Sequence, residues 1–374
     1  MIAPLEGVRI IEFGHYIAAP AATQLLSDLG ADVIKVEAPA GDQARSIGAY
    51  GEGIVQAYNR GKRSVVLDLR DPDGLSRALE LVDSADVVVQ NLRAGAMDRL
   101  GLGPEAMRER HNALVYVSVS AYDPDSPSSE RPGLDIAAQA ESGMMSITGE
   151  PDGDPQRIGF PVADVGASYA VVQAVLAGLL RRERTGEGGT AHVSLLDVAI
   201  HMQSAMWGEW AVTRGEPIRK GNGQATAAPA ADLVSTADGQ IMLSAYTDDT
   251  FARLCHLIDK PWMIDDPRFT DNPARVAHRD ALLSEVSERL TTLTTAQCVK
   301  WLSGNGLVVA AVNSFGDVAQ SADVAASGIL TTGVSPDGDR FTIPSMPFKL
   351  DGVTASPDLR VPAVGESTSL PLRP

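Results

Sequence analysis

The sequence predicts an α/β fold, with a Rossmann-like large domain built on a mostly parallel sheet and a smaller α+β domain. Over the first 120 residues, short β-rich runs alternate with segments of helical spacing. Such alternation implies right-handed crossovers between parallel strands. From residue 232 onward the pattern changes to two strand signals followed by several helices. The length of 374 residues leaves room for about two or three domains of ordinary size.

The first domain is ordered by five runs rich in β-branched and aliphatic residues. Glycine, proline or charged residues bound these runs, which is typical of buried strands. Between them lie segments with apolar residues at helical spacing. The predicted strands cover 8–12, 33–37, 64–69, 86–90 and 113–119, and the predicted helices cover 19–29, 73–83 and 103–109.

The middle of the chain begins with a surface loop at 123–132, which is rich in Pro, Ser and Asp. Two long helices are predicted after it, at 164–184 and 194–213, with a short strand at 191–194 between them. Residues 214–231 are rich in Gly and Ala and are predicted to form a linker.

We therefore divide the chain into a large domain (1–213), the linker, a small domain (232–325) and a C-terminal segment (326–374). The C-terminal segment has many prolines and no strong periodicity, so we expect it to return to the large domain. In the small domain, strands are predicted at 232–235 and 240–245, and helices at 247–258, 275–291 and 294–304.

The charge of the chain limits the partners that we expect. Against 31 Lys and Arg stand 48 Asp and Glu, so the formal net charge is −17. A nucleic-acid partner is therefore not expected, because such binding depends on neutralising phosphates. A small phosphate-bearing ligand remains compatible with this charge, since a few clustered cations are enough to hold one.

Cysteine usage and hydropathy indicate the cellular setting. Cys255 and Cys298 cannot form a disulfide framework and lack metal-ligand spacing, so we expect no metal site. The N-terminus has no signal-peptide pattern, and the longest apolar run, at 170–180, is interrupted by Gln173 and Gly178. We expect a cytoplasmic protein without a membrane partner.

The first strand–helix–strand unit ends in Glu37, the position at which a dinucleotide-binding fold presents a ribose ligand. The preceding turn, Phe13-Gly-His-Tyr-Ile-Ala-Ala19, has one glycine where the nicotinamide fingerprint has three. A nicotinamide dehydrogenase is therefore a remote alternative. His15 lies in this turn, and a ligand contact and a solvated loop position are equally compatible with it.

Asp164 precedes a long apolar helix and admits two interpretations. It is suited to be an N-cap, because Asp satisfies the free amides of a first turn. The same position also suits a nucleophile, because the helix dipole favours the ionised carboxylate, which can attack an activated acyl group. Cations in the first domain are either solvated or converge on one ligand; they are Arg45, Lys62, Arg63, Arg70, Arg93 and Arg99.

Several short motifs follow one another in order along most of the chain. They include Pro4-Leu-Glu-Gly-Val-Arg-Ile-Ile-Glu-Phe13, Leu29-Gly-Ala-Asp-Val-Ile-Lys-Val-Glu37, Asn59-Arg-Gly-Lys-Arg-Ser64, Gly95-Ala-Met-Asp-Arg-Leu-Gly101 and Arg184-Thr-Gly-Glu-Gly188. With these motifs the chain resembles the family III CoA-transferases, also called the CaiB/BaiF family. This group includes formyl-CoA transferase, carnitine CoA-transferase and α-methylacyl-CoA racemase.

The resemblance implies an interlocked homodimer, in which each subunit is a ring threaded by its partner. It implies that coenzyme A enters as part of an acyl-CoA substrate, that a carboxylic acid is the second substrate, and that no cofactor is permanently bound. Asp164 falls on the family's catalytic aspartate. The segments that hold CoA in the family contain His15, Ala18, Leu67, Arg70, Asn91, Arg99 and Leu100.

The implied mechanism begins with Asp164 attacking the thioester, which gives an aspartyl anhydride and then an aspartyl-CoA thioester. Asp135 is expected as a second carboxylate near Asp164. Family racemases carry a histidine in the triplet that reads Gly133-Leu134-Asp135 here, and Leu134 cannot move a proton. Ile17 stands where formyl-CoA transferases have glutamine, which argues against oxalate and formate. Racemase-type α-proton chemistry and a catalytically silent CoA-binding protein remain the alternatives.

Overall fold

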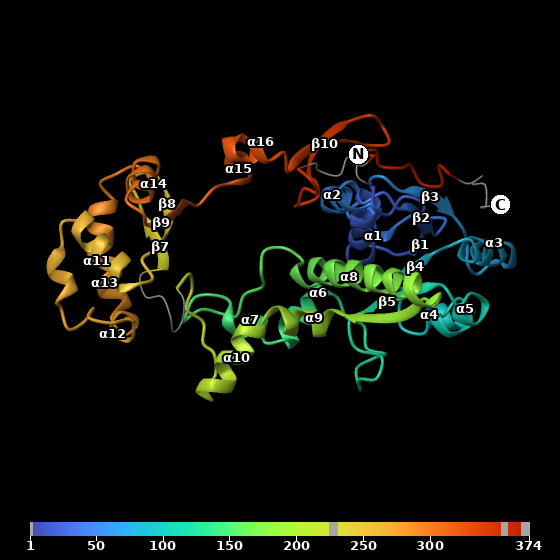
Figure 1. The fold of residues 1–374 in the computed structure, drawn as a ribbon, viewed down its shortest axis with the longest axis horizontal. Helices are drawn as coiled ribbons and strands as arrows, with labels where there is room; N and C mark the ends of the chain where they lie inside the picture. The colour runs from blue at the N-terminus through green and yellow to red at the C-terminus, as the bar shows by residue number, and fades with distance from the viewer. Residues whose placement is uncertain (1–2, 224–230, 353–357, 368–374) are drawn as a thin grey trace. The chain divides into compact units, whose positions relative to one another are not determined.

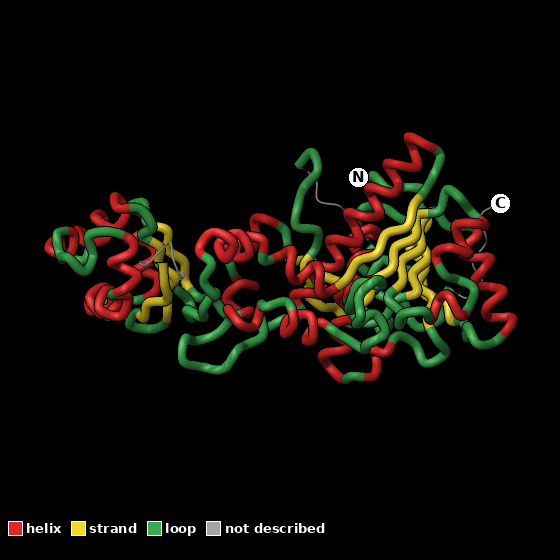
Figure 2. Tube along the Cα trace, turned by 90° about the horizontal axis from the view of Figure 1, so that it is seen from below, coloured by secondary structure: helices red, strands yellow, loops and turns green. Residues whose placement is uncertain are grey.

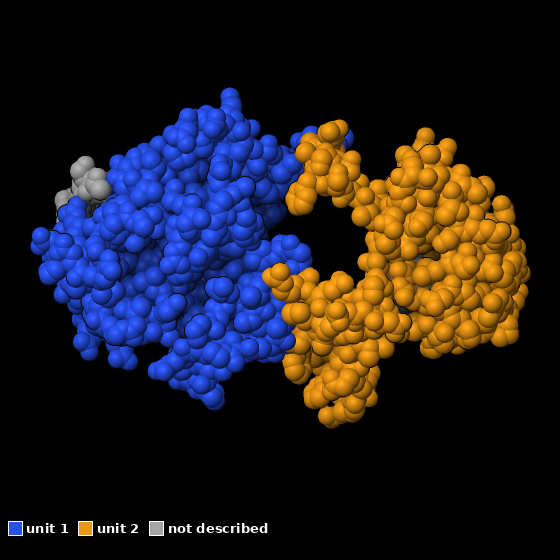
Figure 3. Space-filling model, turned by 180° about the vertical axis from the view of Figure 1, so that it is seen from behind, with its two compact units in different colours: residues 1–142, 158–204, 322–374 blue, residues 143–157, 205–321 orange. Residues whose placement is uncertain are grey.

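The computed structural model describes residues 3–223, 231–352 and 358–367. The end of the predicted linker, 224–230, lies outside these residues. The described chain forms two compact units, which Figure 3 distinguishes by colour. The first unit contains residues 1–142, 158–204 and 322–374, and the second contains residues 143–157 and 205–321.

A six-stranded sheet forms the centre of the first unit (Figure 2). Its order is β3-β2-β1-β4-β5-β6 and every neighbouring pair is parallel. This is the strand order of a doubly wound Rossmann-like sheet, so the predicted fold class is confirmed. The strands are β1 (Arg9–Phe13), β2 (Asp32–Glu37), β3 (Arg63–Val66), β4 (Val87–Gln90), β5 (Val115–Ser120) and β6 (Gly189–Ser194).

Helices cover both faces of this sheet (Figure 1). On one face, side chains of α3, α4 and α5 join Ile11 and Tyr116 of the strands in one buried core. On the other face, α1 and α8 lie side by side and pack against the strands. The helices of this unit are α1 (Ala18–Asp28), η1 (Gln43–Ser46), α2 (Gly48–Tyr58), α3 (Pro72–Asp83), α4 (Ala96–Arg99), α5 (Pro104–Arg110), α6 (Asp135–Glu141), α8 (Val162–Thr185), α9 (Leu195–Met202) and α16 (Ala322–Ser327).

The C-terminal part of the chain adds to the first unit an antiparallel hairpin that the sequence did not indicate. Its strands are β10 (Leu330–Val334) and β11 (Arg340–Pro344). Val361 is fully buried among residues of α1 and α2, and the amide of Gly61 donates to the carbonyl of Arg360 at 2.9 Å. The last described residues therefore complete the core at the α2 end of the sheet.

The second unit is built on a small antiparallel sheet of order β7-β8-β9, next to a bundle of helices. Its core contains Phe251, Phe269 and both cysteines, which are free thiols. Two predicted helices are each divided: 194–213 breaks at Gln203, and 275–291 breaks at His278. The elements are α7 (Met144–Ile147), α10 (Ser204–Thr213), β7 (Ala231–Ser235), β8 (Gln240–Ser244), α11 (Asp248–Leu257), η2 (Pro261–Ile264), α12 (Asn272–Ala277), α13 (Arg279–Leu290), α14 (Thr295–Gly304), β9 (Val308–Ala311) and α15 (Phe315–Gln320).

By length and composition, one helix of the described chain, α8, could cross a membrane. Within the first unit, however, α8 contacts α1, β5 and β6. Val171 and Val175 of its inner side are fully buried. These contacts are those of a helix that packs on the sheet of an α/β unit, a role that also requires an apolar sequence.

Candidate active site

Asp164 is the third residue of α8, and the residue before the helix, Pro161, supplies no side-chain cap. The prediction that Asp164 caps its own helix is therefore wrong. The cap comes from Asp135, whose Oδ1 accepts hydrogen bonds from the amides of Ala163 at 2.7 Å and Asp164 at 3.3 Å. The two predicted catalytic carboxylates thus meet at the N-terminus of α8.

Asp135 is itself buried and fixed from a second side. It is the first residue of α6, and its Oδ2 accepts a hydrogen bond from Nε2 of Gln139 one turn later, at 2.6 Å. Oε1 of Gln139 in turn accepts from the amide of Ile158 at 2.9 Å. The start of α6 and the segment that leads into α8 are therefore held together by side chains of α6. Sequence reasoning did not identify Gln139.

The charge of Asp135 changes the acidity of Asp164. Burial, together with this neighbouring carboxylate, raises the pKa of Asp164 from 3.8 to about 7. The sequence suggested that the helix dipole would keep Asp164 ionised. Asp135 already occupies two of the first-turn amides, and its like charge opposes ionisation of Asp164. Near neutral pH the Asp164 carboxyl of the free protein is therefore about half protonated.

The backbone just before α6 packs closely against the residues after β5, and this packing requires glycine at position 133. A Cβ atom on this residue would lie 2.5 Å from Cβ of Ala121 and 2.9 Å from the ring of Tyr122. Arg131 covers the same ring, with its guanidinium carbon 4.4 Å from the centroid, and forms an ion pair with Glu141 of α6. These contacts fix the backbone that presents Leu134 and Asp135.

A second group of predicted residues lies at the carboxyl ends of the parallel strands, where ligands of open α/β sheets bind. The turn after β1 and the turn after β4 are joined by two hydrogen bonds. The amide of His15 donates to Oδ1 of Asn91 at 2.9 Å, and Nδ2 of Asn91 donates to the carbonyl of His15 at 3.0 Å. The structure therefore brings His15 and Asn91 together.

The ring of His15 is partly buried, and its Nδ1 has no hydrogen-bond partner among the described residues. Burial lowers the pKa of His15, which Asp42 partly offsets, so the imidazole is neutral at pH 7. The positive charges of Lys35 and then of Arg93 add to the lowering of this pKa. A neutral ring at this edge can donate or accept a hydrogen bond without adding charge.

Buried charges beneath this turn form a network that the sequence analysis missed. Lys35 contacts Glu12 at 2.7 Å and Asp42 at 2.9 Å, and Lys62 contacts the other oxygen of Glu12 at 2.7 Å. Burial alone would raise the pKa of Glu12, but Lys35 and Lys62 lower it to about 2. A signal was present in the sequence, because Glu12 and Lys35 are charged residues inside otherwise apolar strands.

The network holds the backbone of the turn as well as the charges. Nζ of Lys35 donates to the carbonyl of Gly14 at 2.8 Å. Oδ1 of Asp42 accepts from the amide of Tyr16 at 3.2 Å. Tyr16 has a φ of 61°, a conformation that a residue with a side chain adopts only at a cost. The buried charges therefore stabilise a strained turn next to His15.

Glu37 belongs to a structural cluster, which corrects its interpretation as a ribose ligand. It is buried, and its oxygens accept hydrogen bonds from Ser64 at 2.6 Å and from the amide of Asp42 at 2.7 Å. Arg45 also pairs with it at 3.1 Å. Because these partners surround both of its oxygens, Glu37 is not presented to a ligand.

The remaining predicted CoA residues occupy the same edge in different states. Ala18 is buried at the start of α1, whereas Leu67 and Leu100 pack partly buried on the core below α3 to α5. Arg70 is 85% exposed and pairs with Asp68 at 3.0 Å, and Arg99 is exposed at the end of α4. Leu67 and Arg70 thus follow β3, and Arg99 and Leu100 follow β4, at the carboxyl ends of neighbouring parts of the sheet.

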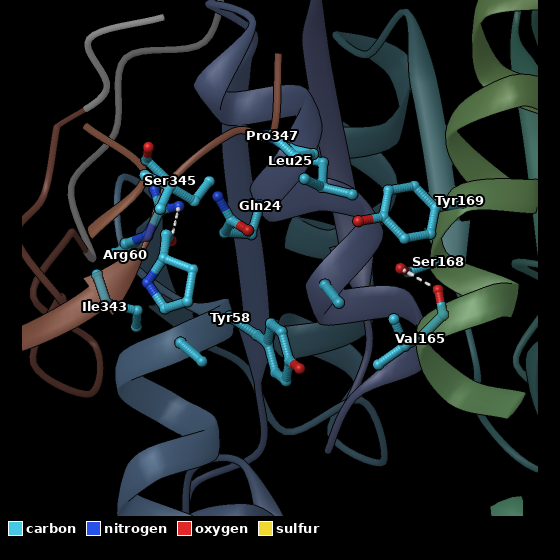
Figure 4. Close-up of a pocket in the computed structure, with 14 residues that line it drawn as sticks. Gln24, Leu25, Tyr58, Arg60, Val165, Ser168, Tyr169, Ile343, Ser345 and Pro347 are labelled. Carbon is cyan, nitrogen blue, oxygen red and sulfur yellow. Dashed lines mark hydrogen bonds between the residues drawn. The ribbon is translucent and has the colours of Figure 1, made fainter. Parts of the chain in front are cut away.

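A cavity of about 260 Å³ lies beside α8 within the first unit (Figure 4). Val165, the residue after Asp164, lines it together with residues of α1, the end of α2 and the C-terminal hairpin. Tyr58 also lines it, and burial raises the pKa of Tyr58, with Tyr50 and then Asp164 adding to the shift. No cluster of residues that could hold a metal ion is present in the described parts of the chain.

Fold and site together define a Rossmann-like α/β protein that carries two carboxylates at the N-terminus of one helix. The model of CoA-transferase family III matches residues 5–368. The chain belongs to this family, and its predicted family membership and enzyme class are confirmed.

Relatives of known name match along nearly their whole length. The chain is 36% identical to a protein of Mycobacterium tuberculosis named probable fatty acyl-CoA transferase Rv3272, over 98% of this chain and 97% of that protein. It is 34% identical to the succinate–glutarate CoA-transferase of Agrobacterium fabrum, over 98% and 90%. A crystal structure of a CaiB/BaiF family protein from Brucella suis matches with a TM-score of 0.88 and 31% identity, over 99% of this chain and 98% of that one.

Proposed function

We propose that this CoA-transferase moves CoA from an acyl-CoA thioester to a free carboxylic acid, with Asp164 as the nucleophile. The observation that carries the proposal is the position of Asp164 on the first turn of α8, with a carboxyl pKa of about 7. A carboxylate with this pKa is more basic than an ordinary aspartate, and it is still ionised in half or more of the molecules at pH 7 and above.

The proposed reaction exchanges one activated acyl bond for another. An oxygen of Asp164 bonds to the thioester carbonyl carbon, the C–S bond breaks, and CoA leaves as a thiolate. The thiolate then attacks the Asp164 carbonyl carbon of the anhydride, which releases the donor acid and leaves an aspartyl-CoA thioester. An acceptor carboxylate repeats these steps in reverse, so no external energy source is needed.

In this proposal, the edge formed by the turns after β1, β3 and β4 holds the CoA moiety. His15 and Asn91 position the turns, while Arg70 and Arg99 pair with phosphate oxygens. Asp135 acts through Asp164 as a positioning residue. Two-base α-proton exchange has no support here, because the exposed side chain beside Asp135 is that of Leu134.

We further propose that the working form is a homodimer. Large apolar side chains of α8, namely Tyr169, Leu176 and Leu180, are between 40% and 47% exposed in the single chain. The helix α10 has no buried residue at all, although it carries Trp207 and Trp210. Exposed apolar surface on this scale is typical of a subunit interface.

The test is chemical trapping during turnover with a panel of acyl-CoA donors and carboxylate acceptors. Hydroxylamine should convert the activated Asp164 into a hydroxamate that peptide mass spectrometry locates. An acceptor labelled with oxygen-18 should leave one labelled oxygen on Asp164, because the anhydride oxygen stays with the enzyme when CoA departs with the acyl group. Transfer without either mark, or full activity of Asp164→Ala, would refute the proposal.

A further inference from the structure

Three large apolar side chains lie exposed around the residues that hold Asp164. Leu134 and Ile136 flank Asp135 at the start of α6 and are 61% and 52% exposed. Phe160 stands two residues before α8 and is 53% exposed. We call Leu134, Ile136 and Phe160 the apolar rim.

Hydrogen bonds fix the rim next to the nucleophile. Oδ1 of Asp135, the residue between Leu134 and Ile136, accepts from the amide of Asp164 at 3.3 Å. Gln139 of the same helix accepts from the amide of Ile158 at 2.9 Å, and Phe160 follows two residues later. The three rim residues therefore stand directly beside, or two residues from, the groups that hold the N-terminus of α8, on whose first turn Asp164 lies.

The charges around Asp164 are negative or neutralised. Burial and the charge of Asp135 set the acidity of Asp164, and no cation of the described chain counteracts them. The cavity beside α8 contains one cationic side chain, Arg60, which is buried and forms an ion pair with Asp28. Its Nη2 donates to Oδ2 of Asp28 at 2.8 Å, while its Nε has no partner among the described residues.

We propose that the acyl group carried by this enzyme is an uncharged alkyl chain that lies on the apolar rim, so that its donor is a monoacyl-CoA rather than the thioester of a dicarboxylic acid. This inference rests on the proposed function. Once the thioester carbonyl carbon bonds to Asp164 and the C–S bond breaks, the chain stays attached beside the rim. An alkyl chain covers apolar surface there, whereas a second carboxylate would lie beside Asp135 without a free cation.

The experiment compares two donors of equal carbon number, butyryl-CoA and succinyl-CoA, with the same acceptor acid. They differ in a terminal methyl against a terminal carboxylate. We expect kcat/KM to be at least about tenfold higher for butyryl-CoA. Calorimetry with the Asp164→Asn variant should likewise show that butyryl-CoA binds more tightly than succinyl-CoA.

A substitution on the rim should reverse the preference. Leu134→Arg adds a cation to an exposed position, so it should raise kcat/KM for succinyl-CoA relative to butyryl-CoA. Phe315→Arg is the matched control, because Phe315 is 96% exposed on the second unit and is not part of the rim. The control should leave the ratio of the two donors unchanged.

The outcomes separate this inference from the proposed function. Efficient transfer with a preference for succinyl-CoA would overturn the alkyl-chain assignment and leave the transferase proposal intact. The second carboxylate of the donor would then be bound by Nε of Arg60 or by a second copy of the chain. A failure of both donors to acylate Asp164, with tighter binding of butyryl-CoA, would refute the transfer mechanism and support the rim. Equal affinity of the Asp164→Asn variant for butyryl-CoA and succinyl-CoA would overturn the rim assignment.

Discussion

Asp164 and Asp135 lie at the same helix N-terminus, and this arrangement lowers the stability of the fold by an amount that depends on pH. In the unfolded chain the Asp164 carboxyl has an ordinary pKa of 3.8, whereas in the folded chain its pKa is about 7. Because the pKa of Asp164 is higher in the folded chain, the folded chain binds the Asp164 proton more tightly than the unfolded chain does. The resulting contribution to the free energy of unfolding is fully present below pH 3.8 and is lost as the pH rises to about 7. Above that pH the loss is constant.

We therefore predict that Asp164→Asn abolishes transfer and stabilises the fold at pH 8. The gain in the free energy of unfolding should be about 2 kcal/mol, after allowance for solvent screening of a half-buried group. Thermal unfolding should show the gain at pH 8 and almost none at pH 4. Asp280→Asn, a first-turn aspartate that is exposed on α13, should show no such pH dependence. A gain that is equal at both pH values would contradict the assignment.

Asp135 sets the pH at which Asp164 becomes reactive. In Asp135→Asn the cap to Ala163 can persist while the negative charge is gone, so the pKa of Asp164 should fall. We predict that the acidic limb of log kcat/KM, near pH 7 in the unmodified enzyme, moves down by about one pH unit. Loss of activity at all pH values with an unshifted limb would assign Asp135 a purely structural role.

At the scale of elements, the turn after β1 is held from below by buried charges and from the side by Asn91. Most of these supports bind backbone groups of the turn, and Nδ1 of the His15 ring has no hydrogen-bond partner among the described residues. The glycine at position 51 illustrates how tightly the neighbouring elements are packed. A Cβ on Gly51 would lie 1.8 Å from the carbonyl oxygen of Ala44, so α2 can approach η1 only with glycine at this position.

Removal of the link between the two turns should affect binding more than chemistry. Asn91→Ala loses both hydrogen bonds to His15, which are worth about 1 kcal/mol each. We predict an increase of about tenfold in KM for acyl-CoA and a smaller change in kcat. The control is Asn112→Ala, which removes a surface contact with Arg108. An unchanged KM in the Asn91 variant would show that this turn does not contact CoA.

At the scale of the whole molecule, the exposed apolar side chains of α8 and α10 should be buried by a second copy of the chain. We predict that the protein sediments at about twice its chain mass of 39.3 kDa. Leu176→Glu and Leu180→Glu together should shift this equilibrium toward the single chain, because they place charge on the exposed side of α8. Glu183→Gln, an exposed polar change one turn later, is the control. A stable single chain at micromolar concentration would exclude the proposed homodimer.

The sheet could be predicted from the sequence because its strands are short apolar runs. The helix α2 was missed, since Gly48, Gly51 and Gly53 weaken its helical signal. The role of Asp164 and the nearness of Asp135 were both implied by the resemblance, whereas the helix cap that Asp135 forms could not be predicted from the sequence. That contact joins residues 28 and 29 positions apart, and sequence spacing carries no information on such a distance.

The first unit is interrupted by the second, and this has a consequence for biosynthesis. The ribosome delivers residues 1–204 first, and more than a hundred residues of the second unit follow before residues 322–374 appear. Until then Gly61 and Ser64 lack the backbone partners that Arg360 and Ser367 supply. The β3 edge of the nascent sheet therefore gains these contacts only at the end of translation, and a truncated product should expose that edge to chaperones and proteases.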